Sequence, residues 1–170
     1  MISFIIGLSA ILFYILSAWT QNNPTSVPVL KSGYTLGLVA WVLQGLYLYL
    51  HLFTKAGLLL DIGAALSLTA WAVIGIIMIS SLRKPVSSLL VFTAPIAALA
   101  IAVDIVSVSS VEGRHFSSGI LLHIITSILS YALFAVAACQ AVLLIYQNRY
   151  LKNHGSSALV ANLPPLQTME

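Results

Sequence analysis

Three side chains with acid, base or ligand chemistry fall inside long apolar runs of this sequence: His51, Asp104 and His123. Neutral imidazole is a common metal ligand, and a carboxylate beside it can orient the second ring nitrogen. An ionisable group in hydrocarbon is costly, so each of these residues needs a partner or a function. The set is therefore suited to bind a metal-centred cofactor, to carry protons, or to join helices by hydrogen bonds.

The remaining ligand types narrow this chemistry. Two histidines without clustered carboxylates do not match a zinc site, and the one cysteine, Cys139, excludes an internal disulfide and a C-x-x-C pair. Haem needs only one or two axial imidazoles and an apolar slot, so these residues match a haem site better than a zinc site. A proton relay and plain helix–helix bonding stay open. We find no nucleophile with a matching base and no phosphate loop, and expect no enzyme activity.

Other polar residues recur at helical spacing beside His51. Gln44, Tyr47 and His51 lie three and four residues apart, so they share one face of a helix. Because polar groups are expensive in hydrocarbon, this face is predicted to pack against protein. Asp104 needs a partner for the same reason, and we expect Arg114 or a neutral histidine to provide it.

The segment that begins at His123 carries hydroxyl and small side chains on one helical face. Such a face lets a second helix or a flat ligand approach closely. Its further members are Thr126, Ser127, Ser130, Phe134, Ala137, Ala138 and Ala141. We interpret His115, just upstream, as part of an interfacial polar loop rather than as an accessory site.

The composition indicates whether these residues lie in a water-soluble protein or in a membrane. Of 170 residues, 60% are hydrophobic and 6% are charged, whereas soluble domains carry about 25% charged residues. This excludes an ordinary water-soluble domain. The seven basic residues are scattered, so no patch follows a nucleic-acid backbone and no nucleic-acid partner is expected.

Apolar runs of about 20 residues, the length that crosses hydrocarbon, occur five times, and Asp104 is the one charged residue within them. We predict spans over residues 2–20, 35–54, 62–82, 89–108 and 120–146, followed by a polar cytoplasmic tail over 147–170. The predicted fold class is all-α, a polytopic transmembrane bundle forming a single membrane domain over residues 1–170.

Small residues and tryptophans also mark packing positions in these spans. Gly63, Ser67, Trp71 and Gly75 follow a four-residue spacing, which predicts a helix-packing groove filled by Trp71. Trp41 and Trp71 are deep in their spans and are predicted to pack without clustering together.

Motifs in and after the fifth span carry a resemblance to a known family. The pattern H-x6-S-Y-A is met by His123, Ser130, Tyr131 and Ala132. The chain then ends in Leu-Pro-Pro-Leu-Gln-Thr-Met-Glu over residues 163–170. The stretch resembles the cytochrome c assembly protein family, with the first pattern similar to CcsA-type haem-handling proteins and the second to the HemX-like, YpjD-type branch.

The resemblance implies a multi-pass protein of the bacterial inner membrane that binds or handles haem near the outer face during cytochrome c maturation. Its implied partners are the lipid bilayer, haem and other maturation proteins. His123 is implied as a haem ligand at the outer face and His51 as an internal ligand. Ser127 and Tyr131 join them as cofactor-binding candidates, and Asp104 is a further candidate in the same layer.

The sequence departs from the family pattern in two ways. Haem-handling members carry a W-G-x-x-W-x-W-D segment, whereas the connection over residues 109–119 holds no tryptophan. Members also continue into about three more spans after the Pro-Pro-Leu run, so we expect this chain to correspond to the first part of the usual unit. Two alternatives stay open: a membrane scaffold or regulatory subunit that binds no haem, and a proton-coupled transporter subunit.

Orientation is predicted from the basic residues, which are enriched in cytoplasmic loops. With the N-terminus outside, the inner side receives Lys31, Arg83, Lys84, Arg149 and Lys152, and the outer side receives Lys55 and Arg114. This N-out, C-in arrangement places His51, Asp104 and His123 in one outer layer. Reporter fusions after residues 85 and 115 are expected to report the inside and the outside, respectively, and the reverse pattern would reject the orientation.

Overall fold

The computed structural model of the chain describes residues 2–22, 33–54, 57–82, 89–107 and 114–152. Its helices are α1 (Ile2–Asn22), α2 (Gly33–Leu52), α3 (Ile62–Ser81), α4 (Leu90–Val106) and α5 (Ser118–Lys152). Two short strands, β1 (Phe53–Thr54) and β2 (Gly57–Leu58), pair antiparallel between α2 and α3. Within these residues the predicted all-α class is confirmed, while the tail beyond Lys152 lies outside them.

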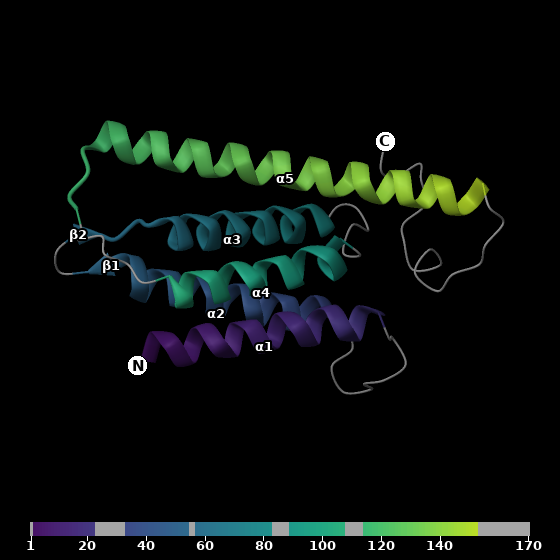
Figure 1. Cartoon of the computed structure of the whole chain (residues 1–170), viewed down its shortest axis with the longest axis horizontal. Helices are drawn as coiled ribbons and strands as arrows, with labels where there is room; N and C mark the ends of the chain where they lie inside the picture. Colours follow the sequence, from purple (N-terminus) through teal and green to yellow (C-terminus); the bar gives the residue numbers. More distant parts are fainter. Residues whose placement is uncertain (1, 23–32, 55–56, 83–88, 108–113, 153–170) are drawn as a thin grey trace.

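The first four helices form an antiparallel bundle, and α5 is added to one side of it (Figure 1). α1 packs on α2 and α4, and α3 packs on α4 and α2. α5 contacts the bundle mainly through α3. We call the end that carries β1 and β2 the hairpin end; α2 and α4 finish there, and α3 and α5 begin there (Figure 1).

Helix length and composition fit a membrane. Among the described residues, four helices are long and apolar enough to cross one: α1, α2, α3 and α5. A helix rises 1.5 Å per residue, so about 20 residues match the hydrocarbon thickness. α4 is also apolar but has 17 residues and is packed between α1 and α3. The chain therefore has the character of a multi-pass membrane protein.

Some helix ends differ from the predicted spans. α2 stops at Leu52 instead of 54 because the next residues pair as β1, and α4 covers 90–106 instead of 89–108. α5 begins at Ser118 and continues to Lys152, so residues 147–152 of the predicted polar tail are helical. The predicted span ended where the sequence becomes polar. The helix continues beyond that point because Gln, Arg and Lys favour the helical conformation.

The hairpin fixes where α5 starts. Leu58 and Arg114 each donate a backbone N–H to the other's carbonyl oxygen at 3.0 Å. Gly57 adopts φ 117°, a conformation that L side chains rarely adopt, and a Cβ there would lie 2.7 Å from the Arg114 carbonyl. Glycine is therefore required at this turn, and the segment leading into α5 is tied to the hairpin.

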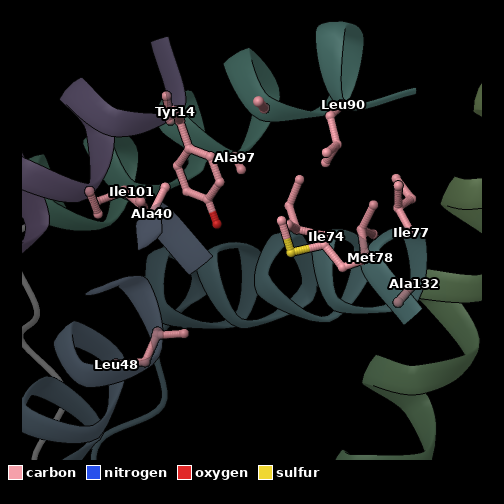
Figure 2. Close-up of a cluster of buried hydrophobic side chains, with 14 of the residues drawn as sticks. Tyr14, Ala40, Leu48, Ile74, Ile77, Met78, Leu90, Ala97, Ile101 and Ala132 are labelled. Carbon is pink, nitrogen blue, oxygen red and sulfur yellow. The ribbon is translucent and has the colours of Figure 1, made fainter. Parts of the chain in front are cut away.

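Apolar side chains from α1 to α4 meet in one core (Figure 2). Tyr14, Ile74 and Ile101 are fully buried there, and Ala40 and Ala97 let neighbouring helices approach. Ala132 reaches the edge of the cluster from α5 (Figure 2). The opposite side of α5 stays exposed, as expected for a surface in contact with lipid.

A chain of hydrogen bonds crosses this core. The Tyr14 hydroxyl donates to Gln44 Oε1 at 2.7 Å, and Gln44 Nε2 donates to the Ser67 carbonyl at 3.0 Å. All three residues are buried, so their polar groups find partners in the protein rather than in water. The prediction that the Gln44 face packs against protein is thereby confirmed, and the bonds tie α1, α2 and α3 together.

Trp41 and Trp71 form a reciprocal pair between α2 and α3. Their rings stack with centroids 4.9 Å apart, and each indole N–H donates to the other residue's carbonyl, at 2.9 and 3.0 Å. Each ring covers a glycine of the facing helix, Trp71 over Gly45 and Trp41 over Gly75. The prediction that the tryptophans do not cluster is wrong, and Trp41, not Trp71, lies over the glycine end of the predicted groove.

The stacked pair leaves little room at Gly75, where a Cβ would lie 3.2 Å from Trp41 Nε1. Gly75→Leu is expected to destabilise the bundle by about 1–3 kcal/mol, because the added side chain must displace the ring. Gly119→Leu is the matched control, since nothing lies within 4 Å of a Cβ there. Unfolding in mixed micelles measures both, and equal losses would contradict the packing.

Candidate functional site

The pair of side chains His51 and Asp104 is the centre of the candidate site. His51 is in the last turn of α2 and Asp104 in the last turn of α4, so both lie at the hairpin end. His51 Nδ1 lies 3.5 Å from Asp104 Oδ2. Of the two partners expected for Asp104, the structure therefore selects a histidine.

Asp104 is 1% exposed, and its surroundings are tight. A Cβ on Gly63 of α3 would lie 2.8 Å from the Asp104 Cα, so the two helices touch beside the carboxylate. Neither carboxylate oxygen has a hydrogen bond of good geometry from any described residue. Within the described part of the chain, the His51 ring is the basic group that lies against this buried acid.

Tyr47 adds a third polar group on the same side of the ring. Its hydroxyl lies 3.2 Å from His51 Nδ1, and the two rings are 5.5 Å apart at their centroids. Tyr47 is buried one helical turn before His51, whereas the His51 side chain is 26% exposed. The Nδ1 side of the imidazole therefore faces protein, and no described residue bonds Nε2.

Asp61 places a second carboxylate at the hairpin end. It is the N-cap of α3, and its Oδ1 accepts the Ala64 backbone N–H at 2.7 Å. Sequence reasoning overlooked this role, although an Asp immediately before an apolar run is a recognised helix-start signal. Tyr47 was expected to face protein but not to reach His51 Nδ1. Asp61 adds a carboxylate and Tyr47 adds a hydroxyl group to the three ionisable residues that the sequence indicated at this end.

The structure places His123 elsewhere. His123 begins the exposed face of α5, and Tyr131, 65% exposed, follows on the same helix. Ser127 is half-buried. α3 lies between α5 and the core of the bundle, so His51 and Asp104 come together while the α5 candidates form no group with them (Figure 1).

The hydroxyl groups of α5 are satisfied within the helix. Thr126 Oγ1 donates to the carbonyl oxygens of Leu122 and His123, at 2.9 and 3.0 Å, and Ser130 Oγ donates to the Thr126 carbonyl at 2.8 Å. This back-bonding removes free donors from a face that meets hydrocarbon. The face is therefore smooth and weakly polar, with the His123 imidazole at its hairpin end.

A cavity of about 620 Å³ lies between the hairpin, α3 and the start of α5. Its walls are aliphatic or aromatic apart from Arg114 and His115, which both line it. Sequence reasoning missed this cavity because its walls come from segments that are more than forty residues apart, and the Leu58–Arg114 pairing and the packing of α5 on α3 bring them together. His115, interpreted as a loop residue, is exposed beside this cavity.

The metal-ligating side chains of the structure can be compared with what the expected haem requires. Within the described ranges, no group of three or more His, Cys, Asp or Glu residues is placed to hold a metal ion. Haem iron is held by its porphyrin and needs only an axial imidazole from the protein. His51 fits that role, because a carboxylate faces Nδ1 and, within the described ranges, no residue bonds Nε2.

Comparison of the chain with protein-family models, with curated proteins and with solved structures finds no match. Inference about function therefore depends on the residues and geometry described above.

The contact between His51 and Asp104 predicts thermodynamic coupling. His51→Ala and Asp104→Ala are each expected to lower the free energy of unfolding, and the double variant to lose less than their sum by about 0.5–3 kcal/mol. Each single change leaves the remaining polar side chain, Asp104 or His51, without its partner, whereas the double change removes both.

A second cycle that pairs Asp104→Ala with His123→Ala provides the control. Because His123 lies on the exposed face of α5, these two changes are expected to add within about 0.5 kcal/mol. Unfolding in mixed micelles measures both cycles. Additivity in the His51 cycle would show that the pair carries no interaction energy.

Proposed function

We propose that this chain is a multi-pass membrane protein of the cytochrome c assembly type that holds haem at the hairpin end of its helical bundle. One observation carries the proposal: the partly exposed His51 imidazole turns Nδ1 toward the buried Asp104, and no described residue bonds its Nε2. The motif H-x6-S-Y-A, which begins at His123, supports the same assignment.

Asp104 acts on His51 in two ways. With the ring proton on Nδ1, the carboxylate attracts that N–H and holds the tautomer whose Nε2 lone pair is available as a ligand. The same contact raises the basicity of Nε2, as second-shell carboxylates do for ligating histidines. When bound, haem supplies the iron that this nitrogen ligates. Tyr47, 3.2 Å from Nδ1, limits rotation of the ring.

His123 belongs to a second position in this proposal. It is exposed on α5, on the face that Ser127 borders and Tyr131 extends. Separate sites for two histidines agree with a protein that passes a ligand along, because each site then holds it through one imidazole. In the proposed N-out orientation both sites lie toward the outer face of a bacterial inner membrane, where other maturation proteins have access to them.

Haem content tests the proposal directly. The protein purified from haem-replete cells is expected to show a Soret band that His51→Ala strongly reduces. Asp104→Asn keeps the size of the side chain but removes its charge, and is expected to weaken haem affinity about 10–100-fold, as loss of a second-shell partner does. Visible absorption during haem titration measures each variant.

His115→Ala is the matched control, since it removes an exposed imidazole that has no carboxylate partner among the described residues. Its spectrum is expected to equal that of the unchanged protein. Absence of haem, or a Soret band indifferent to changes at both His51 and His123, would reject haem binding and favour the scaffold alternative. Proton-coupled transport would instead be recognised by transport whose pH dependence is lost in Asp104→Asn.

A further inference from the structure

The cavity between the hairpin, α3 and α5 is a separate feature from the His51 site. It has a volume of about 620 Å³. Leu52, Leu58, Leu60, Leu68, Ile124 and Ile128 are among the apolar residues that line it. Apart from Arg114 and His115, its side chains offer no polar partners of the kind that ordered water requires. An apolar group is therefore its natural occupant.

The cavity continues as a groove between α3 and α5. A second hollow, of about 270 Å³, shares Leu68, Ile125 and Ile128 with the first and ends at Trp71 and Leu129. The groove opens to the side of the bundle, since Ile125 is 62% exposed and Leu129 is 50% exposed. Its shape is thus elongated along the helices and open toward the position of lipid tails.

One charged residue stands among the lining residues of this groove. Arg114 is exposed. Two hydrogen bonds to Leu58 fix the position of its backbone, and therefore the base of its side chain. Within the described residues it forms no ion pair. It lies where the helices end, the depth at which the headgroups of a bilayer begin. A guanidinium binds phosphate oxygens through paired N–H donors.

We propose that this groove is a binding site for one anionic phospholipid, with an acyl chain along α3 and α5 and the phosphate on Arg114. The apolar walls take the tail, the lateral opening admits it from the bilayer, and the Arg114 guanidinium at the hairpin end selects the negative headgroup. The lipid fills the space that α5 leaves by packing mainly on α3, and it steadies the start of α5.

Native mass spectrometry of the purified protein tests the site. Phosphatidylglycerol and phosphatidylcholine with identical acyl chains are added in turn, and the fraction of protein that keeps one lipid is measured. Both headgroups carry a phosphate, but the choline cation of phosphatidylcholine neutralises it and opposes the Arg114 guanidinium, so phosphatidylglycerol is expected to be retained about tenfold better. Arg114→Gln is expected to bring the two lipids to parity, and Arg114→Lys to restore part of the preference.

Two further variants separate the groove from general lipid adhesion. Ile125→Trp fills the groove and is expected to reduce retention of both lipids, whereas Leu133→Trp, also exposed on α5 but outside the groove, is expected to change neither. Arg149→Gln, at the far end of α5, is the charge control. Unchanged melting temperatures show that each variant is folded.

Three results would overturn the proposal: equal retention of the two lipids, equal effects of Arg114→Gln and Arg149→Gln, or no effect of Ile125→Trp. The measurement uses protein without haem and variants outside the His51 pair, so its outcome is independent of the proposed haem binding.

Discussion

The cost of an unpaired polar group in hydrocarbon controls this structure. With no water to bond, each buried donor and acceptor must find a partner within the protein. Gln44 meets this need by bonding Tyr14 and Ser67, and Trp41 and Trp71 meet it by bonding each other's backbone. These bonds fix the rotation of α2 relative to α1 and α3, which sequence hydrophobicity alone leaves free. The bundle is therefore aligned by its few polar residues.

The same constraint explains why the site lies at the hairpin end. Asp104 is the acid that α4 carries among its buried residues, and it is placed where α2 presents His51 rather than in the middle of the bundle. An imidazole near a helix end keeps one side in protein and the other accessible, which a histidine at mid-depth does not. α5 follows a different solution, in which hydroxyl groups bond their own helix and leave the outer face available to lipid or to another helix.

Part of the candidate site could be predicted from the spacing of polar residues along the helices, but other features of the structure could not. The Gln44–Tyr47–His51 stripe predicted a face turned toward protein, and the need of Asp104 for a partner was also predictable, because both depend on local helical geometry and on the cost of burial. The Trp pair had a signal that was not used: Trp-x-x-x-Gly occurs once in α2 and once in α3, the spacing that lets each ring cover the other helix's glycine. The apolar cavity had no such signal, since it depends on how α5 is tied to the hairpin.

The sequence by itself determined the solvent, the helices and the pairing requirement, because hydrophobicity, length and periodicity are local properties of the chain. Only the tertiary structure decided which histidine answers Asp104, since Arg114, His51 and His123 all lie near the same end and the choice depends on helix order around the bundle. It also decided that His123 faces outward, because α5 packs on α3 through its other side. Neighbour identity in a bundle is set by long-range packing, and no single helix encodes it.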